Sequence, residues 1–329
     1  MKLLIAIFAR MAQPKYSIIV PVYNRPQELD DLLQSLTRQT VRDFEVLIIE
    51  DGSTVTSEKV FEKYAPLLSI TYFFKPNSGP GPSRNFGFER ANGKYFIVFD
   101  SDCQIPPTYL DAVEKYFELK TLDAWGGPDR GHANFTILQQ AMACTMSSVL
   151  TTGGIRGAKA KNFQPRSFNM GISREAYQKT GGFHFDRFAE DIELSIRMKK
   201  LGLQVELIPE AFVYHQRRAT LRQFFNQVSN FGKGRVLVGK AHPGEVKLVH
   251  WIPTLFLLGI DFIVLLTLLV PEIGMLLFSP YLVYLIAIGV DAYRTTQSAQ
   301  VALWSIPSAF VQLIGYGWGF LKEKTRFLT

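Results

Sequence analysis

Two aspartates one residue apart, Asp100 and Asp102, give the clearest chemical signal in this chain. They directly follow the apolar run at residues 95–99, which is typical of a buried strand. Two carboxylates at the carboxyl end of such a strand lie where open α/β folds bind their ligands. Their oxygens suit Mg²⁺ or Mn²⁺ bridging a diphosphate, although the same pattern also occurs in solvated turns and helix caps.

Polar residues also follow two earlier apolar runs. Tyr23 and Asn24 follow residues 16–22, and Asp51 follows residues 44–49. In a parallel sheet these strand ends lie side by side, so residues distant in sequence converge on one cleft. Asp51 is well placed to accept hydrogen bonds from a base or a ribose, and a turn aspartate that caps the next helix is the alternative. The convergence predicts a nucleotide site.

A Gly/Pro-rich segment at residues 77–87 leads into a predicted helix that carries Arg84 in its first turns. A helix amino terminus together with a guanidinium forms an anion site suited to a diphosphate. An ordinary loop capped by serine is the alternative interpretation.

A second acidic pair, Glu190 and Asp191, opens another predicted helix. Acidic residues in a first helical turn are favoured by the helix dipole, so capping is one interpretation. The other is a general base that deprotonates an acceptor hydroxyl.

His215 directly follows the apolar run at residues 211–214. An imidazole at the end of a strand can complete a metal's ligand set, contact a phosphate or serve a structural role.

The elements that position these residues alternate along the chain. Apolar β-rich runs lie at residues 16–22, 44–49, 70–74 and 95–99, with amphipathic segments between the first two and the last two. This alternation predicts an α/β fold with a mainly parallel sheet and helices on both faces. In the segment 26–39 a proline occupies the first helical turn and four leucines fall on one face.

From about residue 247 onward the sequence turns apolar. Residues 251–270, 273–290 and 301–321 each come near the roughly 20 residues needed to cross a bilayer, with Trp and Tyr near their ends. Buried core helices are the alternative. Asp261 lies inside the first segment and the second segment is short, so the sequence is compatible with either two or three spans. The third segment could also lie in the membrane interface. We therefore predict an extension (1–15), an α/β domain (16–235) and a membrane-associated helical region (236–329).

Basic residues precede the first predicted span. Seven Lys and Arg residues lie between 217 and 247 against the single acid Glu245, which predicts multi-pass membrane localisation with the preceding domain on the cytoplasmic side. The net charge of +7 suggests nucleic-acid binding as an alternative, but the sequence contains no nucleic-acid recognition motif that supports it. The two cysteines, Cys103 and Cys144, form no disulfide framework, and residues 2–10 have no convincing cleavage site for a signal peptide.

Six motifs, taken in order, resemble those of the family 2 glycosyltransferases, and the resemblance covers about residues 16–235. They lie at residues 17–24, 50–53, 77–87, 100–102, 181–183 and 190–191. The resemblance implies a GT-A fold, which is Rossmann-like, and a hexosyltransferase-type activity. It also implies a nucleotide-sugar donor, most often a uridine diphosphate sugar, together with a divalent metal and inversion at the anomeric carbon.

On the donor side, the resemblance makes Asp51 similar to the carboxylate that contacts the nucleobase. The nucleotide would also be lined by Pro21, Tyr23 and Asn24. Asp100 is similar to the aspartate on the ribose side.

The remaining carboxylates resemble the metal and acid-base groups. Asp102 is similar to the metal ligand, and His215 is a candidate second ligand. In the pair Glu190–Asp191, Asp191 matches the residue that usually serves as catalytic base. A metal on the leaving diphosphate and a base on the opposite side of the sugar imply in-line displacement.

The sequence departs from the family pattern at two places. Glu50 stands where many members have Asp, a change that we expect to be tolerated because Asp51 is retained. The Gln-x-x-Arg-Trp motif of processive synthases is missing from the sequence, which predicts the addition of a single sugar.

We therefore expect a membrane-anchored, metal-dependent, inverting glycosyltransferase that uses a lipid-linked or membrane-proximal acceptor in cell-surface glycan assembly. A sugar-phosphate nucleotidyltransferase would need a Gly-rich loop after the first strand, and residues 21–26 do not provide it. A non-catalytic scaffold that binds nucleotide sugars is a further alternative, against which the presence of Asp102 and Asp191 argues.

Overall fold

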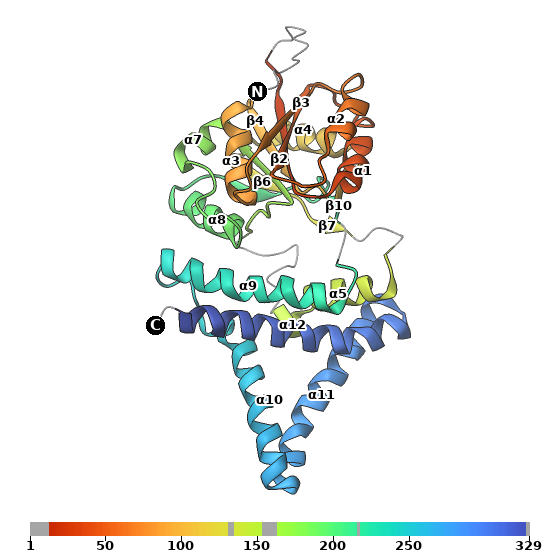
Figure 1. The fold of residues 1–329 in the computed structure, drawn as a ribbon, viewed down its shortest axis with the longest axis vertical. Coiled ribbons are helices and arrows are strands. Elements are labelled where there is room, and N and C mark those ends of the chain that lie inside the picture. The colour runs from red at the N-terminus through yellow and green to blue at the C-terminus, as the bar shows by residue number, and fades with distance from the viewer. Residues whose placement is uncertain (1–12, 131–134, 153–162, 216–217, 327–329) are drawn as a thin grey trace. The chain divides into compact units, whose positions relative to one another are not determined.

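The computed structural model describes residues 13–130, 135–152, 163–215 and 218–326 (Figure 1). The chain divides into two compact units. The first unit comprises residues 1–130 and 161–216, and the second comprises residues 131–160 and 217–329. The boundary that we predicted at residue 235 falls inside a helix of the second unit, because the basic segment continues as that helix instead of ending the α/β domain.

The first unit is built on a seven-stranded sheet in the part of the chain that the structure describes. Its strands, in sheet order, are β3 (Ile70–Lys75), β2 (Phe44–Asp51), β1 (Tyr16–Val22), β4 (Tyr95–Phe99), β8 (Asn169–Ser173), β6 (Ala124–Gly126) and β9 (Val205–Leu207). The pairs β3–β2, β2–β1, β1–β4 and β6–β9 are parallel, whereas β8 runs antiparallel to β4 and β6. The predicted α/β fold with a mainly parallel sheet is confirmed.

Helices cover both faces of this sheet, as Figure 1 shows. On one face lie α1 (Pro26–Leu36), α2 (Glu58–Tyr64) and α4 (Tyr109–Leu119), and on the other lie α3 (Pro80–Arg90), α7 (Arg174–Thr180) and α8 (Glu190–Lys200). Successive side chains of a strand point to opposite faces, so Ile18 and Val20 join one core and Ile19 joins the other. Two buried faces explain why β1 is apolar along its length.

A small three-stranded sheet in the first unit positions the predicted metal site. It consists of β5 (Cys103–Gln104), β10 (Val213–His215) and β7 (Asp129–Arg130), with β10 in the middle. Antiparallel pairing of β10 with β5 places His215 opposite Cys103. This pairing brings His215 beside the Asp100–Asp102 segment.

The second unit is helical in its described residues. It contains α5 (Ile137–Ser147), α6 (Val149–Thr152), α9 (Leu221–Ala241), the short 3₁₀ helix η1 (Leu248–Trp251), α10 (Ile252–Leu269), α11 (Pro271–Thr296) and α12 (Ala299–Arg326). Figure 1 shows α9 and α12 side by side, with α10 and α11 forming a hairpin of apolar helices.

Among the described residues, two helices are long and apolar enough to cross a membrane. They cover Leu248–Leu269 and Pro271–Thr296, with mean hydropathies of 2.4 and 2.1, and most of their apolar side chains are exposed within the unit. The third predicted segment lies in α12 and is not one of these candidates. It buries serine and glycine positions against its neighbours.

Close contact between α9 and α12 depends on glycine. A Cβ added to Gly319 would lie 1.9 Å from the carbonyl oxygen of Ser229. We expect Gly319→Ala to destabilise the second unit by about 1–3 kcal/mol, because the two helix backbones would have to separate. The melting temperature of the detergent-solubilised protein measures this effect.

Gly289→Ala is the matched control for that substitution. The nearest atom to its added Cβ would be the flexible end of Ile306 at 3.3 Å, so little change in melting temperature is expected. Equal melting temperatures for the two variants would contradict the proposed packing of α9 on α12.

Candidate functional site

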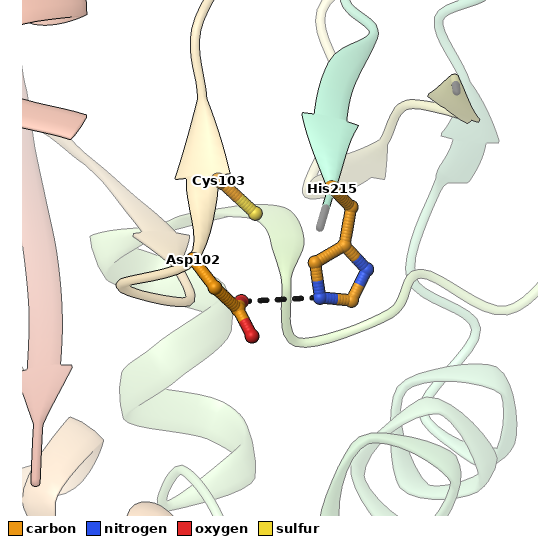
Figure 2. Close-up of side chains that lie close together, drawn as sticks. All are labelled: Asp102, Cys103 and His215. Atoms are coloured by element: carbon orange, nitrogen blue, oxygen red, sulfur yellow. Dashed lines mark ion pairs between the residues drawn. The ribbon is translucent and has the colours of Figure 1, made fainter. Parts of the chain in front are cut away.

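Asp102 and His215 meet in the first unit, as Figure 2 shows. Asp102 Oδ1 lies 3.1 Å from His215 Nε2, and Asp102 Oδ2 accepts a hydrogen bond of 2.6 Å from Arg25 Nη1. The Phe168 ring stacks on the imidazole with a centroid separation of 4.8 Å and an interplanar angle of 18°. The carboxylate is therefore held between two nitrogen groups, and the imidazole contacts both Asp102 and the Phe168 ring.

Cys103 adds a third side chain of metal-ligand type to this cluster. One ligand atom from each of Asp102, Cys103 and His215 lies within 4.8 Å of the others. Burial raises the pKa of the Cys103 thiol well above its usual value, and the nearby Asp102 charge acts in the same direction. A neutral thiol is a poor ligand for Mg²⁺ or Mn²⁺, so the oxygen of Asp102 and the nitrogen of His215 are the donors that fit such an ion.

Sequence reasoning did not identify Cys103 or Arg25 as part of this cluster. The only available signals were their positions next to Asp102 and Asn24, respectively, each within a recognised motif. Their involvement depends on how the loop after β1 approaches the end of β4.

Asp51 at the end of β2 is bound by the loop that precedes α3. Its carboxylate accepts hydrogen bonds of 2.9 Å from the backbone N–H groups of Ser78 and Gly79, and it also contacts Lys75 Nζ. Although burial alone raises the pKa of Asp51, the hydrogen bonds from Lys75 and the two amides lower it below its usual value. The amides that we predicted to bind an anion are thus engaged by Asp51, whose contact with a nucleobase stays a prediction.

The lowered pKa gives the stability of the Asp51 network a defined pH dependence. A carboxyl group whose pKa is lowered in the folded state stabilises that state at pH values above its unfolded-state pKa of about 3.9. This contribution is lost as the pH falls from there through the folded-state pKa. We expect Asp51→Asn to lower the free energy of unfolding at pH 7, and the difference from the wild type to shrink below about pH 4. Denaturant unfolding of the wild type and the variant at pH 7 and below about pH 4 tests this. An equal difference in the free energy of unfolding at the two pH values would contradict it.

The ends of β1 and β2 are joined by Asn24. Its backbone has a φ of 55°, in the left-handed region that asparagine tolerates better than most residues, and its Oδ1 accepts hydrogen bonds from the N–H groups of Thr54 (2.8 Å) and Val55 (2.9 Å). Pro21 pairs with Ile49 in the sheet, and Tyr23 is largely exposed beside this junction. The structure therefore brings the predicted nucleotide-binding segments to one edge of the sheet.

Glu50, where the sequence departs from the family pattern, has structural partners. It is fully buried and accepts hydrogen bonds from the Ser57 N–H at 2.8 Å and the Tyr72 hydroxyl at 3.2 Å, with a further contact to the Ser53 hydroxyl. The longer side chain thus ties the loop after β2 to neighbouring elements.

Arg84 lies buried between two of the predicted site residues. Its Nη1 donates to Glu190 Oε1 at 2.7 Å, its Nη2 donates to Asp100 Oδ1 at 2.8 Å, and its guanidinium lies 5.3 Å from the centre of the Phe183 ring. We predicted that Arg84 binds an anionic ligand, and in this structure its anions are carboxylates of the protein. It links the end of β4 to the start of α8, and a contact with the nucleotide stays a prediction.

Glu190 and Asp191 open α8 in different environments. Glu190 is almost fully buried, and burial raises the pKa of its carboxyl even though Arg84 opposes the shift. Asp191 is more exposed, with Oδ2 3.5 Å from Arg166 Nη1 and Oδ1 accepting from the Ile192 N–H. Asp191 is therefore the more accessible proton acceptor of the pair. The residue before them, Ala189, has a φ of 57°, which is costly for alanine and fixes the direction in which α8 begins.

Comparison with known proteins gives matches along most of the chain. The family model of glycosyl transferase family 2 matches residues 17–181, and that of glycosyl transferase family group 2 matches residues 167–291. A glycosyltransferase of Rickettsia felis is 42% identical over 109 residues, which are 33% of this chain and 17% of that protein. The cholesterol galactosyltransferase of Borreliella burgdorferi is 35% identical over 100 residues, which are 30% of this chain and 28% of that protein. The matches thus span less than a third of these relatives' lengths.

Solved structures share the fold at low sequence identity. The mannosyltransferase PcManGT from Pyrobaculum calidifontis, in complex with GDP-Man and Mn²⁺, has a TM-score of 0.61 and 17% identity over 95% of this chain and 88% of that one. The S. aureus TarS fragment 1–349 has a TM-score of 0.51 and 17% identity over 95% and 92%, respectively. Since the first family model covers half of the sequence, the chain belongs to glycosyl transferase family 2.

Proposed function

We propose that this glycosyltransferase moves a sugar from a nucleoside diphosphate sugar, in the first instance a UDP-sugar, to a hydroxyl of a lipid-linked or membrane-proximal glycan acceptor. One sugar is added in each event, with inversion at the anomeric carbon. The meeting of Asp102 with His215 at the end of β4 is the observation that carries this proposal. The donor class is supported by structural neighbours that were solved with GDP-Man and with UDP-GlcNAc.

Asp102 and His215 are the residues that would hold a divalent cation. A carboxylate suits Mg²⁺ and Mn²⁺ alike, and the added imidazole favours Mn²⁺. When bound, such an ion neutralises charge on the leaving diphosphate. Asp51, Asn24 and Tyr23 lie along the same edge of the sheet, where they would bind and orient the nucleotide.

Asp191 is the proposed general base. It would accept the proton of the attacking acceptor hydroxyl, whose oxygen then forms the bond to the anomeric carbon as the bond to the diphosphate breaks. Arg84 supports this arrangement because it binds both Asp100 on the donor side and Glu190 beside the base. Attack from the side opposite the leaving diphosphate inverts the anomeric configuration.

The acceptor proposal follows from the second unit. Its two apolar helices are long enough to span a bilayer, and the basic residues before α10 favour a cytoplasmic position for the first unit. Anchoring raises the effective concentration of membrane-bound acceptors at the enzyme. The partial match to a cholesterol galactosyltransferase is consistent with an acceptor in the membrane. We propose a role in the assembly of cell-surface glycans.

Release of nucleoside diphosphate by the detergent-solubilised full chain tests the proposed function. UDP- and GDP-sugars would be supplied with a membrane lipid extract as acceptor, in the presence of Mn²⁺, Mg²⁺ or a chelator. We expect turnover of one donor that the chelator abolishes, and a product with inverted anomeric configuration by NMR. Turnover with retained configuration would contradict the mechanism, and no turnover of any donor would favour the non-catalytic scaffold.

A further inference from the structure

Arg25 forms the most direct contact with the predicted metal ligand. Its Nη1 donates to Asp102 Oδ2 at 2.6 Å, while the other carboxylate oxygen, Oδ1, faces His215. A guanidinium thus lies against the carboxylate that would bind a divalent cation in the proposed function. A guanidinium on Oδ2 and a divalent cation held between Oδ1 and His215 would share the single negative charge of one carboxylate and would repel each other.

The two partners of this ion pair differ in burial. The Asp102 side chain is only 6% exposed, whereas the Arg25 side chain is 35% exposed. A buried carboxylate needs a compensating cation because its charge is costly to remove from water. A partly exposed guanidinium can exchange its partner for water or for another anion at much lower cost.

The backbone around Arg25 is fixed, whereas its side chain is partly exposed to solvent. Asn24 is anchored because its Oδ1 accepts hydrogen bonds from the backbone N–H groups of Thr54 and Val55. Arg25 is the N-cap residue of α1 and makes no side-chain hydrogen bond to the helix. Glu28 and Asp100 also attract its positive charge. A rotation of the side chain alone would release Asp102 and leave the guanidinium next to Asn24, one of the predicted nucleotide-binding residues.

We propose that Arg25 is an exchangeable counter-cation of Asp102 that couples the binding of the divalent cation to that of the nucleoside diphosphate. Without ligands Arg25 neutralises Asp102. When a divalent cation takes over Asp102, Arg25 is released and binds the diphosphate that arrives with it. This inference rests on the proposed function, since it assumes that Asp102 is a metal ligand.

The exchange predicts a specific pattern of Mn²⁺ affinities. Arg25→Gln removes the competing charge, so the variant should bind Mn²⁺ without nucleotide about tenfold more tightly than the wild type. UDP or GDP should raise the Mn²⁺ affinity of the wild type by more than tenfold. The enhancement should be about tenfold smaller in the variant, where only direct coordination of the cation by the diphosphate remains. Because linkage is reciprocal, Mn²⁺ should raise the nucleotide affinity of the wild type by the same factor.

The loss of the free Mn²⁺ signal in electron paramagnetic resonance measures these affinities on the full chain in detergent, without any need for turnover. Arg25→Lys keeps the charge and should retain part of the coupling. Lys63→Gln is the matched control: its ammonium pairs with Asp30 on the surface of the same unit, so the variant loses the same charge away from the site. It should behave as the wild type.

The outcomes separate this inference from the proposed function. If the wild type binds Mn²⁺ neither alone nor with UDP or GDP, the proposed metal site is wrong and the exchange falls with it. If the wild type binds Mn²⁺ normally and Arg25→Gln leaves both affinity and coupling unchanged, the exchange alone is refuted. Weaker Mn²⁺ binding by Arg25→Gln under both conditions would also refute it, because Arg25 would then support the site instead of competing for it.

Discussion

Asp102→Asn is expected to reduce sugar transfer by roughly 10²–10³-fold and to abolish Mn²⁺ binding. Asparagine keeps the size of the side chain but removes the negative charge, which is the property that holds a divalent cation and through it the developing charge of the leaving diphosphate. Initial rates of nucleoside diphosphate release at saturating donor measure the first effect. Electron paramagnetic resonance of Mn²⁺ measures the second.

Asp30→Asn is the control for Asp102→Asn. Asp30 lies on α1 and pairs with Lys63 on the surface, so the same chemical change is made outside the site. Its activity and metal binding should match those of the wild type. Full activity in Asp102→Asn would refute the metal role of Asp102, and equal losses in both variants would point to a general effect of charge.

Asp191→Asn is expected to lower kcat by about 10²–10⁴-fold and to leave donor affinity nearly unchanged. The amide cannot accept the proton of the acceptor hydroxyl, whereas the residues proposed to bind the nucleotide at the ends of β1 and β2 are untouched. Steady-state kinetics give kcat, and calorimetric titration with the nucleoside diphosphate gives the binding. Unchanged kcat with a raised KM for the donor would instead make Asp191 a binding residue.

Glu190→Gln gives the informative comparison within the same motif. Glu190 is bound by Arg84, so this variant should lower the melting temperature because a buried guanidinium loses a charged partner. Asp191 remains as proton acceptor, and the loss of kcat should therefore be much smaller than in Asp191→Asn. A larger kinetic defect in Glu190→Gln would reverse the roles that we assign to the pair.

Four strands of the main sheet, β1 to β4, were predicted to within two residues from local pattern, whereas β6 and β9 were not predicted. Apolar runs such as Tyr16–Val22 and Tyr95–Phe99 are buried on both faces, and burial on both faces leaves a continuous apolar signature in the sequence. The antiparallel direction of β8 was not predicted. Strand direction depends on the path of the connections, and no local composition records it.

The membrane region shows where apolar composition stops being decisive. The sequence indicated three segments, and two of them are helices with exposed apolar surfaces that suit a bilayer. The third, in α12, has glycine at positions such as Gly319 that contact α9 directly. Hydropathy counts the apolar residues of a segment but does not reveal which backbone lies against them.

The sequence by itself determined which residue types stand where: carboxylates at strand ends, an acidic pair at a helix start and apolar helices after the α/β domain. These depend on residue type and short spacing, which local pattern reveals. The tertiary structure decided the partners. The pairing of β5 with β10 brings His215 to Asp102, the loop after β1 brings Arg25 to the same carboxylate, and Arg84 joins Asp100 to Glu190. Such contacts are made between residues far apart in the chain, and only the folded path of the backbone fixes their distances.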